Sequence, residues 1–126
     1  MKRLMLAAIA LAACADETVS GYAASGPWRL AAVDGAPVAA RMTLALPSPG
    51  RVAGEGPCNA YSGVQAVPYP WFEVRRLAAT RRACPDLDTE TRWFGMLEAM
   101  TLAEASGDVL VLSDGGTHEM EFRLAD

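Results

Sequence analysis

The sequence is poor in the residues that most often carry metal and nucleophile chemistry. Its 126 residues include one histidine and three cysteines, and its only lysine is Lys2. A zinc site would have to combine Cys58, Cys84 and His118, and their spacing is not that of a zinc ribbon. Ser62 precedes a glycine but is not in a Gly-x-Ser-x-Gly pattern. A hydrolase with a triad or a bound metal therefore has no support, and we expect a non-enzymatic protein without a cofactor.

A group of acidic residues is the remaining candidate for a metal site. Asp86, Asp88 and Glu90 could bind calcium, but the spacing and the glycine of an EF-hand loop are missing. Negative side chains in the first turn of a helix are stabilised by the helix dipole. We therefore interpret these carboxylates as structural and predict no metal site.

The sequence also lacks the positive charge that nucleic-acid binding requires. Its formal net charge is −4, and setting aside Lys2 and Arg3 leaves nine basic against 15 acidic residues, a net charge of −6. Phosphate backbones select basic surfaces, so we expect no nucleic-acid partner. The length fits one domain, and we expect a monomer. About half of the residues are hydrophobic, which is enough to bury a core.

No apolar run in the sequence is long enough to cross a bilayer. Residues 4–13 form an unbroken apolar run of ten, whereas a membrane-spanning helix needs about 20. A short positive segment followed by such a run is typical of a secretory signal. The run ends in Leu11-Ala12-Ala13-Cys14, which resembles a bacterial lipobox.

The lipobox resemblance implies cleavage before Cys14 and a diacylglycerol group on its thiol. Two or more acyl chains anchor a protein stably to a membrane. We therefore predict a lipoprotein signal peptide over residues 1–13, a flexible lipidated tether over 14–26 and one domain over 27–126. Ala15, rather than aspartate, follows the cysteine, which favours the outer over the inner membrane, facing the periplasm. The alternative is an ordinary signal peptide with a chance cysteine.

Lipidation of Cys14 would also explain the odd number of cysteines. It leaves Cys58 and Cys84 as a pair in an oxidising compartment, where a disulfide forms. Closing a loop of this length removes roughly 3.5 kcal/mol of unfolded-state entropy in the chain-entropy model. Asn59 and Thr80 lie near the two cysteines in sequence, so the disulfide would let them hydrogen-bond across strands.

Alternating apolar residues and turns rich in glycine and proline predict many short strands. In the last one, Met120, Phe122 and Leu124 point to one side of the strand. The predicted strands cover residues 28–33, 42–46, 51–54, 59–67, 109–112 and 119–124, with shorter extended runs at 72–74 and 77–79.

One helix is predicted, over residues 89–103. Trp93, Leu97 and Met100 fall at helical spacing and form one apolar stripe, and Pro85 blocks extension toward the N-terminus. Many short strands and one helix predict a mainly β domain built as a small antiparallel β-barrel.

Several motifs occur in an order that is known from a protein family. They are Trp28-Arg29-Leu30 with Gly35, then Gly54, Cys58, Asn59, Tyr61 and Gly63, then Thr80 and Cys84, and finally Glu90, Phe94 and Leu97 in the predicted helix. Over residues 28–124 this pattern resembles the META domain family, also called HslJ-like. Pro57 and Arg82 depart from it, because the family has glycine and methionine at these places.

The resemblance implies a small β-barrel with one helix and a structural role for the motif residues, which include Trp28, Gly54, Asn59, Tyr61, Gly63 and Thr80. It also implies an envelope lipoprotein linked to stress or drug tolerance. The family has no established catalytic activity.

Two arginine pairs, Arg75-Arg76 and Arg81-Arg82, are the most distinctive polar feature. They could contact an anionic partner, such as lipopolysaccharide phosphates or an acidic protein loop. The alternative is that they are solvated residues at strand ends.

The leading hypothesis is a non-enzymatic lipoprotein of the bacterial envelope that contributes to stress or drug tolerance. It would be held to the membrane through Cys14 and would have an envelope protein or glycan as its partner. The alternative is an inhibitor or binding module that presents a barrel loop to a periplasmic or invading hydrolase such as lysozyme.

Overall fold

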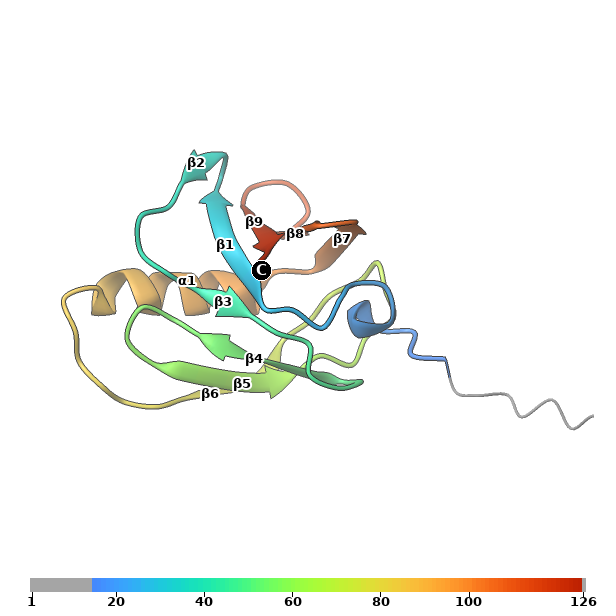
Figure 1. Ribbon diagram of the computed structural model, residues 1–126, viewed down its shortest axis with the longest axis horizontal. Coiled ribbons are helices and arrows are strands. Elements are labelled where there is room, and N and C mark those ends of the chain that lie inside the picture. The colour runs from blue at the N-terminus through green and yellow to red at the C-terminus, as the bar shows by residue number, and fades with distance from the viewer. Residues whose placement is uncertain (1–14, 126) are drawn as a thin grey trace, which may run out of the picture.

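The computed structural model describes residues 15–125, which fold into two β-sheets and one α-helix (Figure 1). A 3-10 turn, η1 (Val19–Gly21), precedes the first strand. The other elements in chain order are β1 (Trp28–Val33), β2 (Ala36–Pro37), β3 (Thr43–Leu44), β4 (Arg51–Glu55), β5 (Ala60–Val64), β6 (Arg75–Ala79), α1 (Leu87–Ala99), β7 (Leu102–Ser106), β8 (Val109–Ser113) and β9 (Glu119–Leu124).

The domain is mainly β with antiparallel sheets and one helix, as predicted, but the two sheets are open, so the predicted β-barrel is not found. The larger sheet has the order β2-β1-β9-β8-β7, with β3 also paired to β1, and the smaller has the order β4-β5-β6. Within residues 15–125, the isolated bridge Ala45↔Ala53 connects the region of β3 to β4, and a second isolated bridge, Trp71↔Leu102, connects the segment before β6 to β7. The strands β6 and β7 end their sheets without pairing to each other, and α1 lies between the sheets, at the left of Figure 1.

The predicted alternation of apolar residues builds the core between the sheets. Trp28 and Leu30 on β1 are 0% and 1% exposed, and Phe122 on β9, the cross-strand partner of Leu30, is 0% exposed. Leu110 and Leu112 on β8 are buried beside them. Each fully buried side chain of this size contributes about 1.5–3 kcal/mol to folding.

The helix is confirmed, but its bounds differ from the prediction. Trp93, Leu97 and Met100 are at most 5% exposed, as the apolar stripe predicts. The helix ends at Ala99, however, and the chain turns extended at Met100. Ala103 pairs with Leu112 of β8, so sheet hydrogen bonds replace the last predicted helical turn.

Several strands are shorter than predicted. The strand predicted over residues 42–46 keeps only Thr43–Leu44, and the bridge Ala45↔Ala53 connects the residue after it to β4. Asn59 precedes β5, which ends at Val64. Residues 72–74 lie outside any strand, and β6 begins at Arg75.

Residues 16–26, predicted to be a flexible tether, instead pack on the domain. Val19 is 1% exposed. Asp16 accepts hydrogen bonds from two nearby hydroxyls. The ring of Tyr22 stacks on that of Tyr69, with 4.3 Å between the centroids. The small polar residues of this segment therefore form a hydrogen-bonded turn around the buried side chain of Val19.

The predicted lipidation site, Cys14, and the predicted signal peptide over residues 1–13 lie outside the described residues. Within residues 15–125, no helix is both long enough and apolar enough to cross a membrane.

Candidate binding groove

A disulfide joins the segment before β5 to the segment before α1. Cys58 and Cys84 are bonded, as predicted, with 5.6 Å between their Cα atoms. The bond lies where the β6–α1 connection leaves the small sheet, so it fixes the position of that connection. Asn59 is thereby held beside residues 80–82.

The Asn59 side chain pairs with this connection as a neighbouring strand would. Its Oδ1 accepts hydrogen bonds from the Arg82 N–H at 2.5 Å and from the Thr80 hydroxyl at 2.9 Å. Its Nδ2 donates to the Arg82 carbonyl at 2.9 Å and to Glu90 Oε1 at 2.6 Å. An amide side chain has two donor hydrogens and two acceptor lone pairs, so the hydrogen-bonding capacity of Asn59 is fully used. The predicted contact between Asn59 and Thr80 is confirmed.

Glu90 is a buried carboxylate that is held by N–H groups. Its residue is 2% exposed, and its Oε2 accepts the backbone N–H groups of Cys58 and Asn59, each at 2.6 Å. It lies in the first turn of α1, where the helix dipole favours a negative charge. The sequence does contain a signal for this role, because Glu90 lies three and seven residues before Trp93 and Leu97 and so shares their buried face.

Gly56 leaves the space that this carboxylate occupies. A Cβ atom at Gly56 would lie 2.6 Å from Glu90 Oε2 and 2.9 Å from the Phe94 ring. The Phe94 ring itself packs against Tyr61, with 5.1 Å between the centroids. The sequence pattern predicted no role for Gly56 and no burial of Glu90, yet the missing side chain of Gly56 is what lets Glu90 and Phe94 take their places in the lining of a groove.

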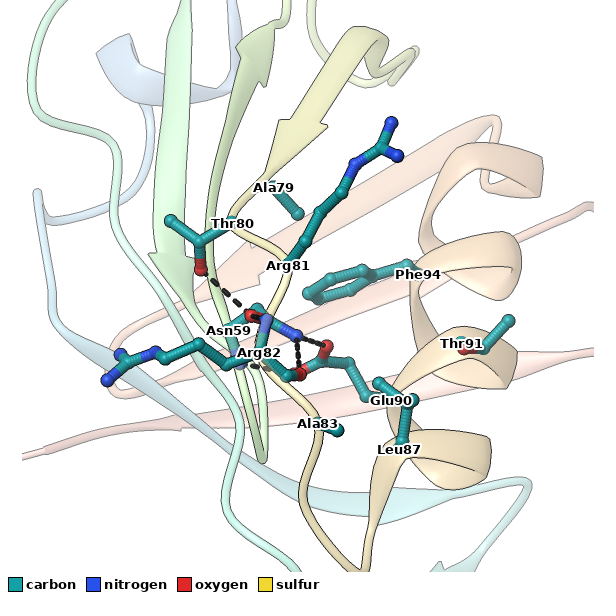
Figure 2. A pocket seen from close by; sticks show the side chains of 10 residues that line it. All are labelled: Asn59, Ala79, Thr80, Arg81, Arg82, Ala83, Leu87, Glu90, Thr91 and Phe94. Atoms are coloured by element: carbon teal, nitrogen blue, oxygen red, sulfur yellow. Dashed lines mark hydrogen bonds between the residues drawn. The ribbon is translucent and has the colours of Figure 1, made fainter.

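The groove lies between the end of β6 and one face of α1, and Figure 2 shows its lining residues. Its volume is about 450 Å³. One wall is the chain from Ala79 to Ala83, and the other is made by Leu87, Thr91 and Phe94 of the helix. Asn59 and Glu90 join the two walls at the base.

Two of the four singled-out arginines line the groove. The side chains of Arg81 and Arg82 extend in opposite directions from the groove wall in Figure 2, and both are exposed. Arg75 and Arg76 lie on β6 itself, where Arg75 Nε is 3.1 Å from Glu73 Oε1. The structure thus places all four arginines on β6 and the segment that directly follows it. Whether they bind an anion stays a prediction.

The comparisons with known proteins identify the family. A family model described as META domain matches residues 22–126. The chain belongs to the META domain family. No curated protein matches it in sequence.

Solved structures share the fold of this META domain. An NMR structure of a protein from Burkholderia xenovorans is 23% identical, with a TM-score of 0.63, and the match covers 80% of this chain and 82% of that one. A crystal structure of a DUF4847 family protein from Bacteroides vulgatus is 12% identical, with a TM-score of 0.67, covering 86% and 99%. At these identities the likeness shows the fold alone.

The other motif residues of the META domain are packed into the fold. Trp28 is 0% exposed and donates from Nε1 to the Ala24 carbonyl at 2.8 Å. The Tyr61 hydroxyl donates to the Thr43 carbonyl at 2.8 Å, and burial raises the pKa of this hydroxyl. A Cβ at Gly54 would lie 2.1 Å from that same carbonyl, so only glycine fits. Gly63 is also close-packed, because a Cβ there would lie 3.1 Å from the Arg75 carbonyl oxygen and 3.1 Å from the Val74 side chain.

The residues weighed as metal ligands are used elsewhere in the structure. Both cysteine sulfurs are in the disulfide, which removes the thiolates that zinc requires. Glu90 points inward to Asn59, away from a shared calcium site with its acidic neighbours. His118 contacts Asp34, with 2.9 Å between Nδ1 and Oδ2, on a loop after β8. Hydrogen bonding and charge raise the pKa of His118 and lower that of Asp34.

Proposed function

We propose that this protein is an HslJ-like, lipid-anchored META-domain protein that acts in the bacterial envelope by binding a partner, and that it contributes to stress or drug tolerance. The groove between β6 and α1 is the proposed binding site. The observation that carries the proposal is the construction of that groove, whose base is made of hydrogen-bonded groups and whose rim carries Arg81 and Arg82.

The state of Glu90 supports binding over catalysis. A general acid or base has to reach a substrate proton within hydrogen-bonding distance. Glu90 is 2% exposed, and its two oxygens accept three N–H hydrogen bonds from residues 58 and 59. This carboxylate is therefore committed to holding the groove together, and we propose that the groove acts without chemistry of its own.

The packing of the N-terminal segment fits an anchored protein. Asp16 already belongs to the folded domain, and only Ala15 separates it from the proposed lipid site at Cys14. Under this proposal the domain lies close to the membrane surface, without a long tether between them.

The anchor is tested by fractionation of cells. Cys14→Ser removes the thiol that would carry lipid, so we expect the variant to leave the membrane fraction or to accumulate uncleaved. Ser25→Ala changes a small residue beyond the anchor and serves as the control. An unchanged membrane association of Cys14→Ser would contradict lipidation.

The groove is tested by complementation of a deletion strain under envelope stress. The double variant Arg81→Glu/Arg82→Glu reverses the charge of the groove rim, and we expect it to fail to restore growth. The matched control is Arg41→Glu/Arg51→Glu, which changes two exposed arginines outside the groove. Full rescue by the first variant at normal protein levels would contradict the proposed site.

One observation favours the inhibitor as a second candidate. The exposed loop after β8 is held in one shape, because Asp114 Oδ1 accepts the backbone N–H groups of Thr117 and His118 at 2.8 and 2.9 Å. A preorganised loop loses little entropy on binding, which is what an inhibitor requires. The test is inhibition of lysozyme by the full chain, with Asp114→Ala expected to weaken it. Absence of any inhibition would remove this candidate.

A further inference from the structure

The geometry points to the open edge of β6 and its extension to Ala83 as a site where an acidic, extended peptide of a partner protein adds as a further strand. This inference rests on the proposed function of the groove and names the chemistry of its partner. Strand addition uses backbone hydrogen bonds for affinity and alternate side chains for specificity.

The first observation is an unpaired strand edge. Among residues 15–125, β5 is the one strand that pairs with β6. The Thr80 N–H donates to the Ala60 carbonyl at 3.0 Å, and the Arg82 N–H donates to Asn59 Oδ1 at 2.5 Å. Because alternate peptide groups of a strand point to opposite sides, those of Ala79, Arg81 and Ala83 point away from β5.

These outward groups are free to bind a peptide. Within residues 15–125, neither the Arg81 N–H nor the Ala83 N–H has a hydrogen-bond partner in the protein. The whole segment from Ala79 to Ala83 lines the groove, so its free edge borders the groove. The side chain of Asn59 fixes the extended course of this segment after β6 has ended. The edge is therefore preorganised for pairing, which lowers the entropic cost of binding.

The second observation is the apolar wall opposite this edge. Leu87 and Phe94 on α1 face Ala79 and Ala83 across the groove, and Leu87 is 38% exposed. A peptide paired with the edge would place every second side chain on the same side. Those side chains would enter the groove between the strand and the helix.

The third observation is the charge of the edge, which selects the partner. Four of the nine arginines beyond Cys14 lie between residues 75 and 82. Arg75 is paired with Glu73, whereas the other three form no ion pair within residues 15–125. This is a positive strip on an otherwise acidic domain. It attracts a negative peptide and repels a second copy of the same strand, because two such edges would bring eight arginines together. Free N–H groups at strand spacing favour a peptide over an isolated phosphate.

The test begins with random peptides of about ten residues, displayed and selected on the full chain in a non-ionic detergent. We expect enrichment of aspartate and glutamate among the selected peptides. On binding, the amides of Ala79, Arg81 and Ala83 should become protected from hydrogen exchange, whereas those of Thr80 and Arg82 are already bonded and should change little.

Variants separate strand addition from charge alone. The double variant Arg81→Glu/Arg82→Glu should bind a selected peptide about tenfold or more weakly than the wild-type protein does. The control variant Arg41→Glu/Arg51→Glu should bind it as the wild-type protein does. The same peptide N-methylated at alternate residues keeps its charge but loses the pairing N–H groups, and it should also fail to bind.

Several results would overturn the inference. They are the absence of enrichment, binding without the alternating protection, equal binding of the methylated peptide, or a response of these amides to lipid A vesicles but to no peptide. If no peptide binds although the rim variant fails under stress, the proposed function stands and strand addition is wrong. If a peptide binds and the rim variant rescues fully, strand addition stands and the proposed function is wrong.

Discussion

Glu90 is the residue on which the shape of the groove depends. Burying a charged carboxylate costs several kcal/mol unless hydrogen bonds or opposite charges compensate. The compensation here comes from the N–H groups of Cys58 and Asn59, from the Asn59 amide and from the first turn of α1. One side chain therefore ties the helix to the start of β5.

Glu90→Gln is expected to destabilise the protein. The substitution keeps the shape but replaces one accepting oxygen by an NH₂ group, which would face N–H donors. Hydrogen bonds to charged groups contribute about 1.5–3 kcal/mol each, so we expect a loss of about 2–3 kcal/mol in urea unfolding. Glu98→Gln, on an exposed position of the same helix, should change the free energy by less than about 0.5 kcal/mol. Equal effects of the two substitutions would contradict the buried role.

The contact between His118, in the loop after β8, and Asp34, in the turn after β1, predicts that the stability of this contact depends on pH. The raised pKa of His118 means that its contribution to stability is complete below the ordinary pKa of 6.5 and is lost as pH rises through the folded-state pKa. The lowered pKa of Asp34 means that its contribution is present above 3.8 and is lost as pH falls through its own folded-state pKa. The attraction is therefore fully present between these two values.

An NMR titration of the His118 ring checks this contact. We expect a pKa above 6.5 in the wild-type protein and a decrease in Asp34→Asn, which keeps the turn because asparagine tolerates the positive φ of 51° at this position. Asp108→Asn, on the turn between β7 and β8, serves as the control. A titration that does not respond to Asp34→Asn would show that the contact is absent in solution.

At the scale of elements, the presence of the helix α1 could be predicted from the sequence, but its end could not. The spacing of Trp93, Leu97 and Met100 is a strong helical signal, and all three are buried. The end of the helix is decided by tertiary contacts, because Ala103 donates to the Pro70 carbonyl at 2.8 Å and joins β7. Local periodicity does not encode such a long-range hydrogen bond, so β7 was missed.

Leu97→Ala tests the packing of this helix. Leu97 is 0% exposed, so truncation leaves a cavity, and we expect a loss of about 2–5 kcal/mol in unfolding free energy. Leu87→Ala is the matched control, because Leu87 is 38% exposed on the groove side of α1. A loss for Leu97→Ala within experimental error would show that the stripe does not pack on the sheets.

At the scale of the whole molecule, the strands were easier to predict than whether they close into a barrel. Alternation identifies which faces of β1 and β9 are buried, but both a barrel and two packed sheets bury the same residues. The difference depends on whether β6 reaches β7, and α1 takes the space between the sheets. The candidate site was predicted only in its parts. Asn59, Thr80 and the arginines were singled out, but Glu90 was considered only as a metal ligand and as a motif residue, and its burial at the base of the groove was not predicted.

The disulfide links this architecture covalently, and its removal should weaken the whole domain. The Cα atoms of Cys58 and Cys84 are 5.6 Å apart, within the usual range for a disulfide. The bond joins cysteines 26 positions apart in sequence and closes a loop that contains β5 and β6, so its loss increases the conformational entropy of the unfolded chain. Removing a native disulfide from a small domain costs about 2–5 kcal/mol.

We therefore expect Cys58→Ala and Cys84→Ala to lower the melting temperature equally, by roughly 10–20 °C, and the double variant to be no worse than either. Each variant loses the same single bond, which is why the effects should not add. The hydrogen bonds of Asn59 with Arg82 and Glu90 still join the same segments, so the variants should remain folded at low temperature. Thiol counting on the unfolded, unreduced protein provides the independent check, because two free thiols beyond Cys14 would refute the bond whatever the melting temperatures show.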